Sequence, residues 1–244
     1  MTDSRYTKRT IIKEIIPSRF LNEDRNVKIY LPPGYNELVT YPVLYCQDGE
    51  DFLHFGRTAT QLTQLILDEG LEPAIAVFVD VDKSKRTSEY APEGERHGDY
   101  IRFFAEELVP FIESRYPART EERVVAGDSL GGTVSLHLAL EYPQLFQRLI
   151  ALSGAFYPST RDRLARETDL SWLSLFMVVG LQEESVATDR GTFNFLQDNR
   201  LARGLLEERK ARIAYSEKNG KHLWGFWQRE LPHALRHFFG GGIA

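Results

Sequence analysis

The sequence predicts an α/β protein with a mostly parallel central sheet and helices on both of its faces. Short apolar runs recur along the chain, as expected for strands that are buried on both faces of a parallel sheet. Helical patterns separate these runs, and strands that alternate with helices imply crossover connections between parallel strands. A length of 244 residues suits a single well-buried core, so we expect one domain over residues 1–244.

The chain opens with two predicted strands that differ from the later ones. Residues 10–16 are rich in β-branched side chains, and residues 27–31 alternate between apolar and polar before Pro32-Pro33-Gly34 ends the run. We expect this hairpin-like pair at one edge of the sheet. The buried strands are predicted at residues 41–46, 74–81, 123–126, 149–152 and 175–179. A more polar run at residues 211–215 is predicted to form an edge strand.

Helices are predicted at residues 100–115, 130–141, 193–209 and 226–239. Pro110 should kink the first helix or restart it, because proline lacks a backbone N–H and its ring clashes with the preceding turn. Tyr142-Pro143 should end the second helix, because the residue before a proline avoids helical dihedral angles.

Charge and composition exclude several classes of function. The chain has 30 Lys and Arg against 35 Asp and Glu, so it lacks the basic surface that binds nucleic acid or an anionic membrane. No apolar run approaches the roughly 20 residues that span a bilayer, and no apolar leader opens the chain, so we expect a cytoplasmic protein. The single cysteine, Cys46, argues against a disulfide or a cysteine-based zinc site and is expected to be a small core residue.

The segment Gly127-Asp128-Ser129-Leu130-Gly131 joins an apolar strand to an apolar helix and predicts a nucleophile elbow. In such a turn the residues two before and two after the serine approach each other closely, which explains the two glycines. The turn would raise the Ser129 hydroxyl above the sheet at the start of the helix. The amide of Leu130 could then face a developing oxyanion.

A serine hydroxyl is a weak nucleophile without a base, and His222 is the leading candidate for that base. It lies in a loop between the last strand and the last helix, where the chain order of serine, acid and histidine would present it. His137 lies on the helix behind Ser129 and is expected to pack there. His233 and His237 lie four residues apart on the last helix, and we expect a surface pair because no third metal ligand accompanies them.

Two carboxylates, Glu183 and Glu184, follow the strand predicted at residues 175–179, and either could orient the histidine. Adjacent residues of an extended segment project in opposite directions, so only one of them should face the base, and Glu183 is favoured. If both glutamates are solvated, Asp189 or Asp198 would supply the acid.

Two further loops could complete the site. The turn after the strand at residues 41–46 offers the backbone N–H of Glu50 as a second oxyanion donor, with an ordinary turn as the alternative. The polar loop at residues 83–99 should follow the carboxyl end of a strand, where open α/β sheets bind ligands. We expect Arg86, Glu89 and Tyr90 of this loop to form one wall of the substrate pocket, with a solvated loop as the alternative.

Several segments together resemble one known family. They are residues 28–35, 41–45 with Asp48-Gly49, 107–112, 126–132 and 153–156, and the loop of His222 followed by Trp224. On these segments the chain resembles the putative esterase family of α/β-hydrolases, which includes enterochelin-esterase-like proteins, esterase D and the mycolyltransferases. One departure is Lys221, which stands where similar proteins often carry a second glycine before the histidine.

The resemblance implies an α/β-hydrolase fold and the cleavage of carboxylic esters. We expect no metal or cofactor, because the sequence offers a nucleophile and a base but no convincing set of metal ligands. The implied triad and oxyanion amides fall on Ser129, Glu183 or Glu184, His222, Glu50 and Leu130. Residues 155–172 occupy the place where many α/β-hydrolases insert a large cap, so we expect no cap domain and an open cleft. Trp224 is a candidate for substrate contact in that cleft, as are Trp172 and Trp227, with core packing as the alternative for each.

The predicted activity is therefore that of a serine hydrolase acting on a small-molecule ester. An acyltransferase or a thioesterase would use the same acyl-enzyme on Ser129. A catalytically silent binding protein could also use this fold, but the retained serine, histidine and glycines argue against that class.

Overall fold

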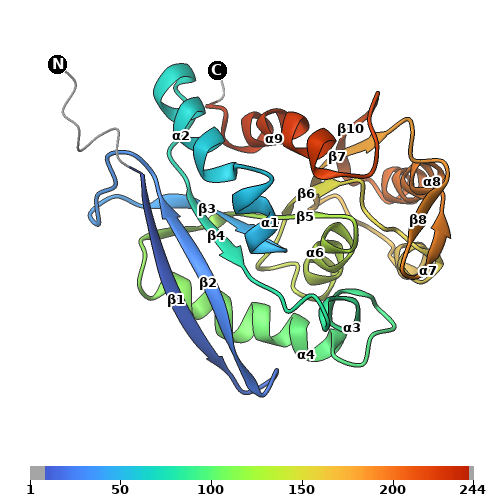
Figure 1. The fold of residues 1–244 in the computed structure, drawn as a ribbon, viewed down its shortest axis with the longest axis horizontal. Helices are drawn as coiled ribbons and strands as arrows, with labels where there is room; N and C mark the ends of the chain where they lie inside the picture. The colour runs from blue at the N-terminus through green and yellow to red at the C-terminus, as the bar shows by residue number, and fades with distance from the viewer. Residues whose placement is uncertain (1–8, 242–244) are drawn as a thin grey trace.

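The computed structural model describes residues 9–241 and is built around an eight-stranded sheet (Figure 1). The strand order is β1-β2-β4-β3-β5-β6-β7-β10. The pairs β1/β2 and β2/β4 are antiparallel, and every other neighbouring pair in this sheet is parallel. The strands are β1 (Thr10–Ser18), β2 (Glu23–Leu31), β3 (Tyr41–Cys46), β4 (Ile75–Val79), β5 (Ala118–Asp128), β6 (Arg148–Leu152), β7 (Ser174–Gly180) and β10 (Arg212–Lys218).

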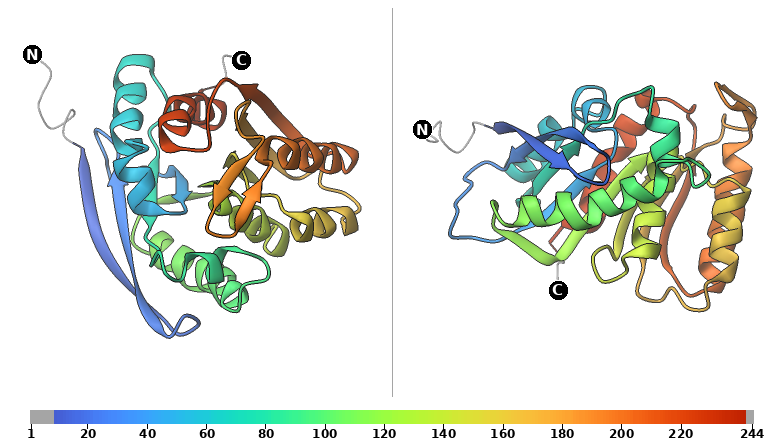
Figure 2. Two further views of the ribbon diagram at one scale, coloured as in Figure 1. Left: turned by 45° about the vertical axis from the view of Figure 1, so that its right-hand side comes forward. Right: turned by 90° about the horizontal axis from the view of Figure 1, so that it is seen from below.

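Helices cover both faces of the sheet (Figure 2), and an apolar core lies between the sheet and the helices on each face. One face packs against α1 (Gly49–His54), α2 (Thr58–Glu69) and α9 (Trp224–Phe239). The other face packs against α4 (His97–Arg102), α5 (Val109–Glu113), α6 (Leu130–Glu141), α7 (Pro158–Arg166) and α8 (Phe195–Glu208). Strands β3 and β4 are buried along their whole length, as are β6 and β7 after their first residue and β5 in its second half, which explains the apolar runs in their sequences.

The predicted strands are all present, and β1 and β10 form the two edges of the sheet, as expected. The predicted helix at residues 100–115 is divided into α4, a π-helical turn (Phe103–Leu108) and α5. Pro110 is the second residue of α5, so the helical segment restarts there. The wider π turn directly before it accommodates the proline ring, which would clash with the preceding turn of a regular α-helix.

Other elements were not predicted. Helix α2 has three threonines in its first six residues, which weakens its helical signal. The segment at residues 83–99 is not an irregular loop, since it contains α3 (Arg86–Tyr90) and the start of α4. A small hairpin of β8 (Val186–Thr188) and β9 (Gly191–Phe193) follows β7 and lies beside the main sheet.

The carboxyl ends of the parallel strands position the candidate site. Ser129 follows β5, Ser153 follows β6, Glu183 comes just after β7, and His222 lies in the loop between β10 and α9. Because parallel strands end at the same edge of a sheet, residues that are far apart in the sequence meet above this edge. Residues 155–172 contain only the short helix α7, so no large cap domain lies in this connection.

Candidate active site

Ser129 sits on a strained turn between β5 and α6. Its φ is 51° and its ψ is −121°, values that are uncommon for a residue with a side chain. A Cβ atom added to Gly127 would lie 2.1 Å from the carbonyl carbon of Gly131, so any side chain at position 127 would collide with the backbone. The two glycines therefore allow the tight turn, which has the geometry expected for a nucleophile elbow.

The structure brings Ser129, His222 and Glu183 into one hydrogen-bonded series. The Nε2 atom of His222 lies 2.9 Å from the Oγ atom of Ser129, and its Nδ1 atom lies 2.7 Å from the Oε2 atom of Glu183. Such an arrangement allows Nδ1–H to donate to the carboxylate while Nε2 accepts the serine proton.

The Glu183 side chain is completely buried, yet both of its oxygens accept hydrogen bonds. The Oε1 atom accepts from the backbone N–H of Gly180 at 2.8 Å and from the hydroxyl of Ser153 at 2.7 Å. The Nε1–H group of Trp227 in turn donates to the Oγ atom of Ser153 at 2.8 Å. These bonds replace the water that a buried carboxylate loses.

The alternative acids lie elsewhere. Glu184 is exposed, which agrees with the opposite projection of adjacent residues. Asp198 forms a 2.6 Å ion pair with Arg161, and Asp189 is an exposed residue at the tip of the β8–β9 hairpin. Neither aspartate contacts the imidazole of His222 through a hydrogen bond within the described part of the chain.

The remaining histidines lie away from Ser129. His137 is buried on α6, where its Nε2 atom lies 3.1 Å from the hydroxyl of Thr160. Burial, with a smaller contribution from the nearby His97, lowers the pKa of His137 to about 3, so this side chain is neutral. His233 and His237 are exposed on α9.

A cleft of about 470 Å³ opens beside Ser129 and His222. Among the residues predicted to line the pocket, Arg86, Trp224 and Trp227 line it, whereas Trp172 does not. Leu130, the predicted oxyanion donor, also lies at the cleft. The guanidinium of Arg86 is held by two hydrogen bonds to Asp48, from Nε to Oδ1 at 2.7 Å and from Nη2 to Oδ2 at 2.8 Å. Trp224 packs edge-to-face on both Phe52 and Trp227, so this wall of the cleft is rigid and aromatic.

Glu89 and Tyr90 do not line the cleft, which corrects the expectation for these two residues. The carboxylate of Glu89 is fully buried, and the guanidinium of Arg25 donates to both of its oxygens at 2.8 and 3.0 Å. The Tyr90 hydroxyl accepts a hydrogen bond from the backbone N–H of Asp48 at 3.1 Å. These contacts hold α3, which carries Arg86, and the turn that carries Asp48 in place, so both residues stabilise the cleft without contacting it.

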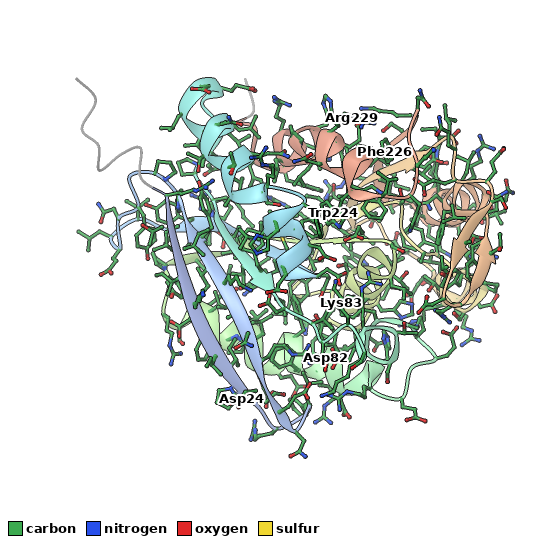
Figure 3. All side chains as sticks on the ribbon, viewed as in Figure 1. Asp24, Asp82, Lys83, Trp224, Phe226 and Arg229 are labelled. Carbon is green, nitrogen blue, oxygen red and sulfur yellow. The ribbon has the colours of Figure 1, made fainter. Side chains whose placement is uncertain are left out.

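Sequence reasoning missed several residues of the cleft wall. Lys83, which Figure 3 labels near the centre of the view together with Trp224, pairs with Asp51 at 2.6 Å. Residues 188–190 of the β8–β9 hairpin also line the cleft, as does Tyr157, over whose ring the Arg190 guanidinium lies at 5.0 Å. Strands of three residues have no recognisable period in a sequence, so no signal pointed to this hairpin.

Asp128, next to Ser129, is an unusual component of this wall. It is only 5% exposed, and its Oδ1 atom is buried without a hydrogen-bond partner in the described part of the chain. Burial, together with the negative charge of Asp48, raises the pKa of Asp128 to about 7. By contrast, the pKa of Asp48 is lowered despite its burial, because Arg86 and Lys83 are bound to it.

The Glu50 side chain points away from the cleft toward Lys28, with Oε1 and Nζ 3.3 Å apart. Its backbone N–H lies in the first turn of α1, ahead of the first intrahelical hydrogen bonds, which Asp51 and Phe52 donate to the carbonyl of Asp48. Leu130 is the first residue of α6, and its N–H likewise precedes the first intrahelical hydrogen bonds, which Gly132 and Thr133 donate to the carbonyl of Ser129.

Residues 9–241 contain no group of three or more His, Cys, Asp or Glu side chains arranged to hold a metal ion. Cys46 is completely buried in the core, where burial raises the pKa of its thiol well above the usual value. Over the same residues, no helix is long and apolar enough to cross a membrane.

Comparisons with known proteins agree with this geometry. A protein-family model described as "Putative esterase" matches residues 18–238. The Bacillus subtilis (strain 168) protein described as "Uncharacterized protein YjcH" is 34% identical over 223 residues, which cover 90% of this chain and 93% of that protein. The iron(III) enterobactin esterase of Escherichia coli (strain K12) is 30% identical over 237 residues, which cover 91% of this chain and 56% of the esterase. The chain therefore spans a little over half the length of that relative.

Solved structures show the same fold. A ferulic acid esterase superposes with a TM-score of 0.82 at 18% sequence identity, covering 96% of this chain and 99% of the other. The enterobactin esterase from Shigella flexneri, crystallised in the presence of enterobactin, superposes with a TM-score of 0.81 at 23% identity, covering 95% of this chain and 59% of the other.

The sheet topology, the elbow and these comparisons define an enzyme with the α/β-hydrolase fold that hydrolyses carboxylic esters. The chain belongs to the putative esterase family.

Proposed function

We propose that this enzyme cleaves small carboxylic esters through an acyl-enzyme on Ser129, with His222 as the general base and Glu183 as the acid that orients it. The observation that carries the proposal is the pair of hydrogen bonds that His222 makes, 2.9 Å to Ser129 and 2.7 Å to Glu183. A base within hydrogen-bond distance of the nucleophile, itself oriented by a third group, is the arrangement that activates a serine hydroxyl.

In the first half of the reaction, Ser129 Oγ attacks the ester carbonyl carbon while Nε2 of His222 takes the hydroxyl proton. The backbone N–H groups of Leu130 and Glu50 stabilise the negative oxygen of the tetrahedral intermediate. Collapse of this intermediate breaks the bond to the alcohol, and the proton on Nε2 passes to the alkoxide oxygen as it leaves. Glu183 stabilises the imidazolium that exists between these two transfers.

In the second half, a water molecule replaces the alcohol above Ser129. The neutral His222 takes one proton from this water as its oxygen attacks the acyl carbon, and the second tetrahedral intermediate forms at the same amides. Collapse releases the carboxylic acid and returns the proton to Ser129 Oγ. The cleft beside Ser129 supports this step, because it is open enough to admit water after the alcohol departs.

The proposed substrate contacts are Arg86 and Trp224, which form two sides of the cleft. Arg86 is fixed by Asp48, and Trp224 by its packing on Phe52, so both present preorganised surfaces to an ester. Relatives are described as iron(III) enterobactin, acetyl and feruloyl esterases, so the substrate is best sought with a panel of siderophore, acetyl, feruloyl and thioester compounds.

The direct test is labelling with a fluorophosphonate, followed by peptide mass spectrometry. We expect the label on the peptide that contains Ser129. The Ser129→Ala variant should not be labelled, and its turnover of the best ester should fall by about 10⁴ or more, because the triad acts as a unit. Near-normal turnover by that variant would overturn the assignment of the nucleophile.

The same labelled enzyme separates the alternatives. A catalytically silent binding protein would neither react with the probe nor release product from any ester. An acyltransferase would form the acyl-enzyme but give more transfer product than acid when an acceptor alcohol is added. A thioesterase would turn over acyl thioesters faster than the matching oxygen esters.

A further inference from the structure

We propose that Ser153 and Trp227 are positioning residues for the catalytic acid: they fix the Glu183 carboxylate so that its second oxygen stays aimed at His222. This inference rests on the function proposed above, in which Glu183 orients the base. Neither Ser153 nor Trp227 touches the reacting atoms in that mechanism. Ser153 acts through Glu183, whereas Trp227 acts through its hydrogen bond to Ser153 and also packs edge-to-face against the imidazole of His222.

The proton directions in this network follow from the chemistry of its members. The indole N–H of Trp227 can only donate, so the 2.8 Å contact requires the Oγ atom of Ser153 to accept. The hydroxyl of Ser153 has one proton, and its 2.7 Å contact with Oε1 of Glu183 directs that proton to the carboxylate. Trp227 therefore sets the direction in which Ser153 donates.

This arrangement holds one carboxylate oxygen and leaves the other for the base. Oε1 of Glu183 receives two donors, the Ser153 hydroxyl and the Gly180 N–H, whereas Oε2 faces Nδ1 of His222. With Oε1 held from two directions, rotation of the completely buried carboxylate would break two hydrogen bonds. The imidazole is thereby held in the orientation that directs Nε2 at Ser129.

The backbone of Ser153 gives independent support. Its φ is 50°, in the left-handed region that favours glycine. A glycine at this position would relieve the strain, and Gly154 already follows directly in the sequence. The chain nevertheless carries a fully buried serine here, and strained side-chain-bearing residues of this kind cluster at functional sites. The feature that serine adds over glycine is the hydroxyl that donates to Glu183.

The decisive variant is Ser153→Gly, because it removes the hydroxyl and relaxes the backbone at once. We expect kcat to fall by about ten- to a hundredfold, less than loss of the Glu183 carboxylate itself would cost, with KM changed by less than about twofold. We also expect the acidic limb of the pH–kcat profile to move upward by about half a pH unit, because a carboxylate with fewer donors stabilises the imidazolium more. The melting temperature should stay within a few degrees of wild type.

Ser135→Ala is the matched control. Ser135 is also a fully buried serine, but its hydroxyl has no hydrogen-bond partner within the described residues. This variant should keep the wild-type kcat and pH profile. Trp227→Phe tests the next link, since it keeps an aromatic ring at that position but removes the N–H. It should shift the pH profile in the same direction as Ser153→Gly, whereas Trp172→Phe should leave the profile unchanged.

Two outcomes would overturn the proposal. A Ser153→Gly enzyme that remains folded and has the wild-type kcat and pH profile would show that the hydroxyl does not position the acid. A loss of activity with an unmoved pH profile and a melting temperature lowered by many degrees would assign a purely structural role. Failure of the proposed function itself is distinguishable, because it would appear as an active Ser129→Ala enzyme, whatever Ser153→Gly does.

Discussion

The imidazole of His222 lies flat on the ring of Phe195, with ring centroids 3.9 Å apart and ring planes only 11° apart. Phe195 is the first residue of α8 and is completely buried. The imidazole is also packed from the side by Trp227, in an edge-to-face contact at 4.9 Å. The proposed base is thus confined by two aromatic surfaces as well as by its hydrogen bonds.

We expect Phe195→Leu to lower kcat by about five- to twentyfold with little change in KM, because a leucine fills space but offers no flat surface to hold the ring plane. Steady-state kinetics on the best ester, normalised to the fraction of fluorophosphonate-reactive enzyme, would measure this effect. Phe146→Leu is the matched control, since Phe146 is a buried phenylalanine of the core that does not contact His222. Equal loss in both variants would contradict a specific role for the stacking.

The two glutamates after β7 should differ sharply in importance. Glu183→Gln should lower kcat by at least about a hundredfold, because an amide cannot stabilise the imidazolium and can favour the wrong tautomer. Glu184→Gln should lower kcat by less than about tenfold, since its side chain is exposed. The reverse ranking would transfer the role to Glu184, and two mild variants would direct attention to Asp189 or Asp198.

Activity should not depend on a metal ion. The proposed mechanism uses a serine, a histidine, a glutamate and backbone N–H groups, and needs no Lewis acid. Prolonged dialysis against EDTA, followed by assay in metal-free buffer, should leave kcat within the error of the untreated enzyme. Loss of activity that one added metal restores would refute this prediction.

The buried Asp128 should make the stability of the protein depend on pH. Because its pKa is raised to about 7 in the folded state, the folded protein binds a proton that the unfolded chain loses at lower pH. This proton binding raises the free energy of unfolding. The effect is fully present below a pH of about 4, the pKa of the carboxyl in the unfolded chain, and is lost as the pH rises through about 7. Asp128→Asn resembles the protonated carboxyl at every pH.

We therefore expect the stability of Asp128→Asn relative to the wild type, measured by urea unfolding, to increase by about 1–3 kcal/mol between pH 5 and pH 8. Asp24→Asn is the charge-matched control. Asp24 lies near the end of the β1–β2 ribbon, is exposed and does not line the cleft beside Ser129 (Figure 3). It should change the unfolding free energy by less than about 0.5 kcal/mol at either pH. Identical pH slopes for Asp128→Asn and the wild type would disprove the assignment.

Glu89 should matter for stability rather than for substrate contact. Glu89→Gln removes the fully buried carboxylate that pairs with Arg25 and leaves this almost fully buried guanidinium with the partly exposed Glu23 as its remaining charged partner among the described residues. Breaking a buried ion pair on one side costs about 3–5 kcal/mol, so the melting temperature should fall clearly. The KM of the enzyme that remains folded should be close to that of wild type. A raised KM without a loss of stability would return Glu89 to the substrate pocket.

Local sequence signals predicted most of the sheet and the central residues of the candidate site. The elbow around Ser129 is a short pattern between a strand and a helix, and each strand of the core is a compact apolar run. The alternation of side chains along an extended segment predicted that only one of Glu183 and Glu184 would face the base, and the buried position of Glu183 and the exposed position of Glu184 agree with it. Each of these features depends on residues that lie within a few positions of one another in the sequence.

The features that were missed depend on partners far away in the sequence. Glu89 resembles an ordinary polar loop residue until Arg25 is brought to it from β2. Ser153 gains its role from Trp227, which lies on the last helix, and from Glu183 after the next strand. The β8–β9 hairpin consists of strands too short to show a period, and only its place beside the cleft makes it relevant.

The β8–β9 hairpin forms part of the cleft wall but contains none of the three proposed catalytic residues. It begins three residues after Glu183, whose carboxylate is held by Gly180 and Ser153, and it ends just before Asn194, whose side chain caps α8 by accepting from the N–H of Gln197. Both anchors are independent of the residues at the hairpin tip. Exchanging the tip residues 188–190 for those of another family member, which leaves Phe193 packed on Phe195, should therefore change the substrate preference while the proposed serine, histidine and glutamate keep their positions.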